Sequence, residues 1–575
     1  MTRKLTEKID ALLARERGTI YKARGADVEV ALAYPNTYHV GMSNLGVHQI
    51  YAVLNRRDDT ACERVFLPDE DDREEYYRTG TALAALESQR PVKDFDILAF
   101  SVSFEQDYLN VLEMLDLAGI PAGRSERGPG DPLLVLGGIC TFFNPEPLAD
   151  FFDIMIIGEG EEVVQEFIEV FRLNRDKGRD ALLRALCSVE GIYVPGFYEV
   201  EYLADGRIRG RTRLVPEAPE RIRKRSVSDI DRAAASSVIL TPDTEFSDMH
   251  LAEITRGCGR HCRFCMAGYI YLPPRNLSSD QAGEQAKRAD DVCGKIGLVG
   301  SALSDYPAID ELCARIEGSL SVSSLRADSL SPALIERLAR SGHKTISIAP
   351  EAGSERLRKV INKGLDEADI LRAADLVFGS GIPNLKLYFI IGLPTETDDD
   401  VAEISALAQK VREVQLRHAR AAGRIGRITL SVNSFVPKPF TPFQWEPMEA
   451  VASLNRKMRS LEKTLKPVGN MNVIHDLPKW EYFQALLSRG DRRLGRLLQA
   501  AHRHDGDWKA AARELGADMD FYVARRRDFD EVLPWDFIDI GVRKDYLKKE
   551  FERALEGKYT PPCKVGSCKT CGVCG

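Results

Sequence analysis

Residues 251–265 read Leu-Ala-Glu-Ile-Thr-Arg-Gly-Cys-Gly-Arg-His-Cys-Arg-Phe-Cys. This stretch places Cys258, Cys262 and Cys265 in a C-x3-C-x2-C loop directly after an apolar segment. Soft thiolates at such short spacing suit three corners of an iron–sulfur cluster, which leaves the fourth iron without a local protein ligand. An incomplete ligand shell is typical of a reactive metal site, whereas structural sites are closed. The alternatives are a zinc site completed by His261 and three uninvolved thiols.

The chain beyond this loop alternates short apolar runs with helical patterns. The apolar runs occupy 296–299, 320–325, 344–351, 385–392 and 428–432, and helical patterns lie at 331–341, 354–362, 367–379 and 398–419. This alternation predicts a parallel sheet with right-handed crossovers. In parallel sheets of this kind the functional residues lie at the carboxyl ends of the strands, so the cysteine loop is expected at that edge.

These features resemble the radical S-adenosylmethionine (SAM) superfamily, in which an aromatic residue precedes the third cysteine of the loop. Phe264 fills that position. The resemblance implies a partial (β/α)6 barrel over residues 246–446, a [4Fe-4S] cluster on Cys258, Cys262 and Cys265, and SAM as cofactor. It further implies reductive cleavage of SAM to methionine and a 5′-deoxyadenosyl radical, which takes hydrogen from a substrate. A reductant such as flavodoxin or ferredoxin would supply the electron.

The resemblance also indicates which strand-end residues contact SAM. Gly300 stands where the family carries a Gly-Gly-Glu segment, although the glutamate is absent here. Ser324 and Arg326 are expected to hold the ribose and carboxylate of SAM, since a guanidinium matches a carboxylate. Glu351, in a segment similar to Glu-Ser-Gly-Ser, would supply the missing carboxylate, with a capping or ion-pair role as the alternative. Gly392 matches a turn of the methylthiotransferase-like branch that approaches the adenine.

Before the cysteine loop, residues 28–195 again alternate strand-like and helical segments, which predicts a doubly wound, Rossmann-like domain. Gly137 and Gly138 after one strand, and Gly158–Glu161 after the next, resemble cobalamin-binding domains that precede many radical SAM barrels. The Asp-x-His-x-x-Gly element that supplies a lower cobalt ligand is absent, and His39 is a poor match in spacing. The alternatives are cobalamin held without a histidine and a cofactor-free descendant of the domain, and we expect no corrinoid to bind.

The remaining segments complete an α/β protein with a mostly helical C-terminal extension. They are a helical lead-in at 1–27, a hairpin and linker at 196–245 with a turn at Asp205–Gly206 and a charged linker run at 220–225, and a helical region at 447–575. One predicted helix, 480–502, carries Arg489, Arg492, Arg493 and Arg496. This basic face favours phosphate or RNA, with a solvated charged face as the alternative.

The chain ends in a second cysteine cluster, Cys563, Cys568, Cys571 and Cys574. Four thiolates at x4, x2 and x2 spacing form a complete ligand set, which fits either a second [4Fe-4S] cluster or tetrahedral zinc. The spacing does not choose between these metals. The other five cysteines are isolated and are expected to act as small buried hydrophobic residues.

Composition narrows the classes of function. The chain has 575 residues, a formal net charge of -8 and 44% hydrophobic residues, which excludes a small disulfide scaffold and a surface built wholly to coat nucleic acid. No apolar run reaches the roughly 20 residues that span a bilayer, and no signal peptide is recognised, so we expect a cytoplasmic protein without a membrane partner. Alternatives to radical chemistry on an unknown substrate are an RNA or tRNA methylase or methylthiotransferase-like enzyme, and a non-enzymatic iron–sulfur carrier or metal-binding RNA adaptor.

Overall fold

The N-terminal domain is built on a six-stranded sheet of order β2-β1-β3-β4-β5-β6 in the computed structural model, which describes residues 1–22, 25–423 and 425–574. Five strands are parallel and β6 is antiparallel to β5. The strands are β1 (Val28–Tyr34), β2 (Thr60–Phe66), β3 (Ile97–Ser101), β4 (Leu133–Gly137), β5 (Ile154–Ile156) and β6 (Ile192–Tyr193). The sequence therefore predicted the doubly wound sheet correctly.

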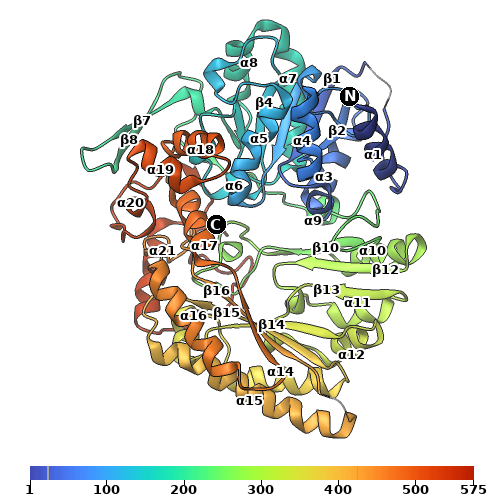
Figure 1. Ribbon diagram of the computed structural model, residues 1–575, viewed down its shortest axis with the longest axis vertical. Helices are drawn as coiled ribbons and strands as arrows, with labels where there is room; N and C mark the ends of the chain where they lie inside the picture. Colours follow the sequence, from blue (N-terminus) through green and yellow to red (C-terminus); the bar gives the residue numbers. More distant parts are fainter. Residues whose placement is uncertain (23–24, 424, 575) are drawn as a thin grey trace.

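Helices surround this sheet, as the upper part of Figure 1 shows. They are α1 (Arg3–Leu13), α2 (Tyr38–Gly41), α3 (Leu45–Asn55), α4 (Glu70–Thr79), α5 (Tyr108–Ala118), α6 (Ile139–Phe143), α7 (Gly160–Asn174) and α8 (Arg179–Leu186). A parallel sheet covered on both faces has strands that are apolar throughout, and β1 is buried at every residue except Glu29.

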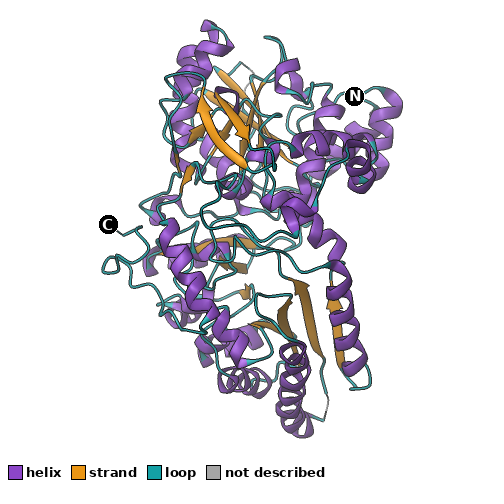
Figure 2. Cartoon of the chain, turned by 90° about the vertical axis from the view of Figure 1, so that its left-hand side faces the viewer, coloured by secondary structure: helices purple, strands orange, loops and turns teal. Residues whose placement is uncertain are grey.

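The second domain is a partial barrel of parallel strands, and helices cover its outer face (Figures 1 and 2). Its two sheets meet through a parallel bridge between Leu325 and Ile348. The strands are β10 (His250–Arg256), β12 (Lys295–Gly300), β13 (Ser319–Val322), β14 (Thr345–Glu351), β15 (Asn384–Ile391), β16 (Ile428–Ser434) and β17 (Met471–His475), with β11 (Arg275–Asn276) antiparallel to β10. The helices are α10 (Ser279–Val292), α11 (Ile309–Arg315), α12 (Pro332–Arg340), α13 (Glu355–Val360), α14 (Glu367–Gly379), α15 (Asp398–Ala422) and α16 (Val451–Leu465).

Strand β15 shows how the sequence forms the barrel wall. Leu385, Leu387, Phe389 and Ile391 are buried, while the residues between them are partly exposed. Alternate residues point to opposite faces of a strand, so the apolar set packs against the helices. The intervening residues, such as Tyr388, face the interior of the barrel.

The C-terminal region runs along one side of both domains (Figure 1). Its elements are α17 (Pro478–Arg489), α18 (Leu494–Arg503), α19 (Trp508–Leu515), α20 (Asp520–Val523), β18 (Ile538–Asp539) and α21 (Lys544–Leu555). The short segment between the two domains contains the hairpin β7 (Tyr198–Tyr202) and β8 (Ile208–Arg213), then β9 (Ile222–Arg223) and α9 (Ile230–Ala233).

Three details differ from the sequence-based expectations. Residues 220–225 are not a free linker, because β9 within them pairs with β18. The barrel sheet does not end by residue 446, because β17, within the mostly helical C-terminal region, pairs with β16. The helix expected at 480–502 is two helices, and the side chain of Asn144 explains the break. Its Nδ2 donates hydrogen bonds to the carbonyl oxygens of Ser488 and Gly490, at 2.9 and 2.8 Å.

Candidate functional site

The cysteine loop begins where β10 ends, and a glycine makes the turn into it. Gly257 has a φ of 82°, and a Cβ there would lie 2.5 Å from the carbonyl oxygen of Tyr271. Only glycine fits such a position without strain. Beyond the turn, Cys262 is buried, whereas Cys258 and Cys265 are partly exposed.

The three thiols lie close enough for their charges to interact. Burial, followed by the charges of Cys262 and Cys258, raises the pKa of Cys265 to about 12. Burial and the charge of Cys262 also raise the pKa of Cys258. Such thiols stay protonated until a metal ion takes the place of the proton. In chemistry and proximity, this donor set fits the [4Fe-4S] cluster that the sequence predicted.

Charged residues from neighbouring strand ends surround the loop. Glu351 has a φ of 67°, a strained backbone conformation of the kind that clusters at functional sites. Its Oε1 lies 3.1 Å from Nζ of Lys363, whose carbonyl oxygen accepts a hydrogen bond from Nη2 of Arg326 at 2.9 Å. Burial opposes the charge of Arg326, but the charges of Cys262 and Asp328 raise the pKa of that guanidinium. Positive charge therefore lies beside the thiolates, where an anionic ligand would be stabilised.

The other residues that were predicted to contact SAM differ in their exposure to solvent. Ser324 is exposed at the end of its strand, and Phe264 is half-buried against the core. The cap of α13 is Ser354, whose Oγ accepts a hydrogen bond from the backbone N–H of Leu357 at 3.0 Å. Ser354, not Glu351, therefore caps the helix. Glu351 instead forms the ion pair with Lys363, which was the other structural role considered for it.

Gly392 occupies a tight turn after β15. Its φ is 78°, and a Cβ would lie 2.9 Å from Cδ2 of Leu454 on α16. Its N–H donates a hydrogen bond to Oε1 of Glu396 at 2.8 Å. Helix packing and turn geometry alone thus account for glycine at this position.

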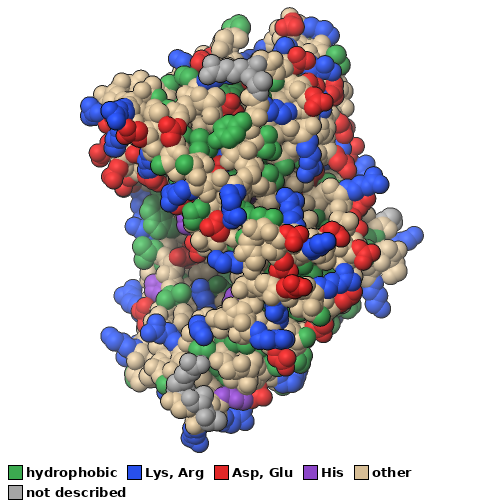
Figure 3. All heavy atoms as spheres, turned by 90° about the vertical axis from the view of Figure 1, so that its right-hand side faces the viewer, with side chains coloured by type: hydrophobic (Ala, Val, Ile, Leu, Met, Phe, Trp, Pro, Cys, Tyr) green, Lys and Arg blue, Asp and Glu red, His purple; other side chains and the backbone are tan. Residues whose placement is uncertain are grey.

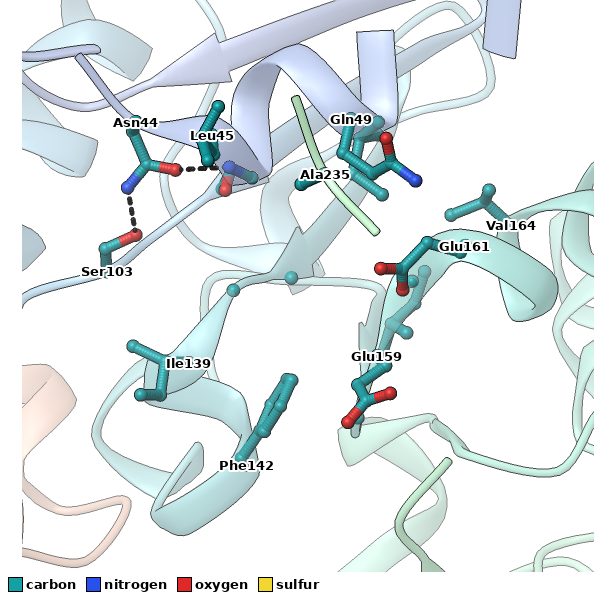
Figure 4. A pocket seen from close by; sticks show the side chains of 18 of the residues that line it. Asn44, Leu45, Gln49, Ser103, Ile139, Phe142, Glu159, Glu161, Val164 and Ala235 are labelled. Carbon is teal, nitrogen blue, oxygen red and sulfur yellow. Dashed lines mark hydrogen bonds between the residues drawn. The ribbon is translucent and has the colours of Figure 1, made fainter. Parts of the chain in front are cut away.

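A cavity of about 650 Å³ lies between the two domains. Its lining includes the carboxyl ends of β3 and β4 from the N-terminal sheet, and Gly257, Gly300 and Ser301 from the barrel. Figure 4 shows Ile139 and Phe142 projecting from α6, opposite Glu159 and Glu161 at the start of α7. Because Gly257 directly precedes Cys258, the cavity reaches the start of the cysteine loop.

Gly137 and Gly138 both line this cavity, but they play different structural roles. Gly138 has a φ of 96°, and a Cβ there would lie 2.4 Å from the carbonyl oxygen of Val102. At Gly137 the nearest atom to a Cβ would be the carbonyl oxygen of Phe100 at 3.9 Å, so this position is open. A large, mostly apolar space beside small residues fits the nucleotide tail of a corrinoid. No histidine stands among the described residues that line the cavity.

An ion-pair network crosses from the N-terminal domain to the barrel. Oε2 of Glu159 lies 3.0 Å from Nη1 of Arg256, and Oε1 lies 2.5 Å from Nη2 of Arg275. Glu161 also contacts Arg256, Oε1 to Nη2, at 2.7 Å. The sequence analysis missed this network. The available signal was the Gly-Glu-Gly-Glu segment at 158–161, together with an arginine directly before the cysteine loop.

The arginines expected to form a basic face are used inside the protein instead. Arg489 is buried and donates to the carbonyl oxygens of Val523 and Arg525, while Arg492 pairs with Glu146, Nε to Oε2, at 3.0 Å. Arg493 pairs with Asp491 at 2.6 Å, and of the four only Arg496 is largely exposed. The expected basic face on one helix is therefore wrong, because carboxylates and carbonyl groups of the protein itself pair with three of the four guanidiniums, and most of these partners are distant in sequence. On the face shown in Figure 3, Lys and Arg alternate with Asp and Glu.

The first of the four tail cysteines lies next to the cysteine loop. The backbone N–H of Cys563 donates a hydrogen bond to the carbonyl oxygen of Gly259 at 2.7 Å. Within residues 1–22, 25–423 and 425–574, no group of three or more His, Cys, Asp or Glu side chains is disposed to hold a metal ion as it stands.

Two further residues near the loop were missed by the sequence analysis, Asn362 and Lys363. Asn362 has a φ of 54° and hydrogen-bonds the carbonyl oxygens of Arg260 and His261. The signal was the Asn-Lys-Gly end of a helix, where a left-handed residue is common.

Comparison with known proteins assigns the class. A family described as radical SAM proteins, N-terminal, matches residues 46–195, and the radical SAM superfamily matches residues 252–408. The uncharacterised protein MJ0966 of Methanocaldococcus jannaschii is 32% identical over 482 residues, which cover 82% of this chain and 90% of that protein. The chain therefore belongs to the radical SAM superfamily, and MJ0966 is a relative along nearly its whole length. Membership implies a [4Fe-4S] cluster and SAM as cofactors, as the cysteine loop predicted.

Other similarities are more distant. The tRNA-2-methylthio-N(6)-dimethylallyladenosine synthase of Thermotoga petrophila is 25% identical over 201 residues, 32% of this chain and 45% of that enzyme. The cobalamin-dependent SAM radical enzyme OxsB with aqua-cobalamin bound is 16% identical with a TM-score of 0.47, covering 92% of this chain and 80% of that one. The methyltransferase TsrM of Kitasatospora setae, with cobalamin and a [4Fe-4S] cluster bound, is 14% identical with a TM-score of 0.43, covering 70% and 74%. Across the described residues, no helix combines the length and apolarity needed to cross a bilayer.

Proposed function

We propose that this protein cleaves SAM reductively at a cluster on Cys258, Cys262 and Cys265, and that its substrate reacts in the cavity between the domains. The observation that carries this proposal is the shared wall of the cavity. It joins Gly257, the residue before the first cysteine, to the strand ends of both sheets. A radical formed at the loop would meet a substrate there without crossing bulk water, which suppresses side reactions.

The bound cluster would supply one electron to the sulfonium of SAM, so that the bond between sulfur and C5′ breaks and leaves methionine and a 5′-deoxyadenosyl radical. The chain's own residues bind and orient SAM. Arg326, whose Nε and Nη2 donate to the carboxylate of Asp328, offers its remaining Nη1 to the carboxylate of SAM, and Glu351 offers a carboxylate to the amino group of SAM. Lys363 holds Glu351 in place through their ion pair. The electron would come from a reductant of the flavodoxin or ferredoxin class.

The deciding experiment measures 5′-deoxyadenosine. The anaerobically reconstituted and reduced protein should release 5′-deoxyadenosine and methionine from SAM, and Cys262→Ala should abolish both. Cys187→Ala, which removes an isolated cysteine of the N-terminal domain, is the control and should retain full activity. Unchanged cleavage in Cys262→Ala would refute the assignment of the loop. No cleavage by the wild type with several reductants would favour the carrier or adaptor class instead.

A second candidate is corrinoid-dependent methyl transfer, and the cavity is the observation that favours it. The sequence led us to expect no corrinoid, because the histidine motif is absent. The open position at Gly137 and the apolar space between the domains favour a bound corrinoid. Incubation with hydroxocobalamin followed by desalting tests this, and a retained visible band at about one per chain would support it. Loss of the entire band on desalting would indicate that the domain is a cofactor-free descendant of the cobalamin-binding domains.

The similarity to a tRNA-2-methylthio-N(6)-dimethylallyladenosine synthase suggests RNA as a further substrate class. The internal use of Arg489, Arg492 and Arg493 weakens the original argument for RNA. A filter-binding assay with unmodified tRNA over a range of salt concentrations separates the cases. Affinity that falls steeply with salt would indicate phosphate contacts, whereas absent binding at low salt would exclude this substrate class.

A further inference from the structure

The tail of the chain is docked on the cysteine loop through direct backbone contact. Besides the 2.7 Å hydrogen bond from Cys563 to Gly259, a Cβ on Gly259 would lie 3.3 Å from the Cβ of Cys563. The first tail cysteine thus touches the residue that follows Cys258. The C-terminus lies at the level where the two domains meet (Figures 1 and 2).

The side chain of Asn362 forms hydrogen bonds with both the cysteine loop and the tail. Its Nδ2 donates to the carbonyl oxygens of Arg260, His261 and Thr560, at 3.3, 3.2 and 3.1 Å. Its Oδ1 accepts the backbone N–H of Thr560 at 2.9 Å. One amide therefore holds the tail just before Cys563 and the loop just after Cys258.

A buried arginine makes the second connection. The side chain of Arg263 is 0% exposed and pairs with Glu550 of α21, Nη2 to Oε2, at 3.0 Å. The same Nη2 donates to the carbonyl oxygen of Lys558 at 2.7 Å. Arg263, which directly follows the second loop cysteine, is thus bound to the segment that leads into the tail.

The distal part of the tail is also held in place. Cys571 is buried, and its carbonyl oxygen accepts the backbone N–H of Arg543 at 2.9 Å. Nη2 of Arg543 donates to the carbonyl oxygen of Thr570 at 2.8 Å. The first and third of the four tail cysteines, Cys563 and Cys571, are therefore both fixed by backbone hydrogen bonds.

We propose that Cys563, Cys568, Cys571 and Cys574 bind a second [4Fe-4S] cluster, built directly against the cysteine loop. The observation that favours iron over zinc is the docking of the tail on a loop whose own three thiols suit an iron–sulfur cluster, through the contacts of Cys563 with Gly259 and of Thr560 with Asn362. The run Cys568-x2-Cys571-x2-Cys574 is compatible with the bacterial ferredoxin run, and zinc is the outcome that metal analysis would detect. Four protein thiolates close the ligand shell, so this cluster has no open iron for SAM. The site is independent of SAM cleavage, and its test uses metal content rather than activity.

The first test isolates the tail within the full-length chain. A triple variant with Cys258→Ala, Cys262→Ala and Cys265→Ala retains all four tail thiols. After anaerobic reconstitution with iron and sulfide it should hold about four iron atoms per chain. Adding Cys568→Ser and Cys571→Ser should remove them, whereas adding Cys187→Ser and Cys293→Ser, two isolated cysteines, should not.

A second measurement covers the case in which the triple variant does not fold. Reconstituted wild type should contain about eight iron atoms per chain, and the tail cysteines should resist alkylation until a chelator and oxidant destroy the clusters. Wild type with about four iron atoms and one zinc, or with tail thiols alkylated at once, overturns the proposal. If the tail cluster is present but no 5′-deoxyadenosine forms, the proposed function fails and this inference stands.

Discussion

Glu159 and Arg256 form an ion pair between the domains, with Oε2 of the first 3.0 Å from Nη1 of the second. Both side chains are nearly buried, with exposed fractions of 3% and 9%. The pair lies on the wall of the cavity, directly before the cysteine loop. It therefore fixes the position of the N-terminal sheet relative to the loop where the chemistry is proposed.

We predict that Glu159→Gln destabilises the protein. The change leaves Arg256 and Arg275 without their shared carboxylate, and breaking one partner of a buried pair costs about 3 kcal/mol. The midpoint of urea unfolding should fall accordingly. Glu162→Gln, at an exposed position that pairs with Arg225 at 3.5 Å, is the control and should change stability by less than about 0.5 kcal/mol. Equal midpoints for both variants would contradict a structural role for the pair.

Gly137→Leu should abolish corrinoid retention if the cavity holds one. The backbone there accepts a side chain, since the nearest atom to a Cβ would be 3.9 Å away, so the leucine would fill the cavity without preventing folding. The visible band retained after desalting with hydroxocobalamin reports the result. Gly128→Leu, where a Cβ meets nothing within 4 Å, is the control. A full band in Gly137→Leu would place any corrinoid elsewhere.

Asp107 should make the protein less stable as the pH rises. Burial, with a contribution from the charge of Glu105, raises the pKa of Asp107 to about 6, although Asn36 and Asn110 donate hydrogen bonds to it. Between about pH 4 and pH 6 the native state binds more protons than the unfolded state, so stability falls over that window. Asp107→Asn should raise the free energy of unfolding at pH 7.5 by up to about 3 kcal/mol. At pH 4 the two proteins should match, and a gain of equal size at both pH values would contradict this origin.

Arg326→Lys should weaken SAM binding about tenfold, equivalent to about 1.4 kcal/mol, because a lysine cannot keep the two-point contact that Arg326 makes with Asp328 and also donate to the carboxylate of SAM. Equilibrium dialysis of SAM against the anaerobic reconstituted protein measures the affinity. Iron content should not change, which separates loss of SAM binding from loss of the cluster. Arg340→Lys on the outer surface of α12 is the matched control. Unchanged affinity in Arg326→Lys would assign the SAM carboxylate to another residue.

The sequence predicted those parts of the fold that follow from local patterns of apolar, glycine and cysteine residues. The C-x3-C-x2-C loop and the alternation of apolar runs with helices indicated the barrel, and Gly137 and Gly138 indicated the edge of the N-terminal sheet. Strand β17 was missed because it lies among helices, although Val473 and Ile474 beside the Gly469–Asn470 turn were a strand signal.

The site could be predicted only in part, because its other components depend on contacts between distant segments. The cavity belongs to neither domain alone, and Glu159 meets Arg256 and Arg275 only once both domains are folded. The same limit explains the error over the arginines. Glu146 lies 346 positions from Arg492, and no pattern within one helix reveals that pairing.

The contact between Arg263 and Glu550, 287 positions apart, bears on how the barrel behaves as a unit. Residues 246–446 expressed alone would deprive Arg263 of its carboxylate and expose apolar side chains such as Phe443, which packs against Phe551 of α21. The barrel is therefore not a transplantable module. A chimera that borrows it for another enzyme has to carry α21 as well, and insertions tolerated elsewhere in the chain should fail between residues 544 and 560.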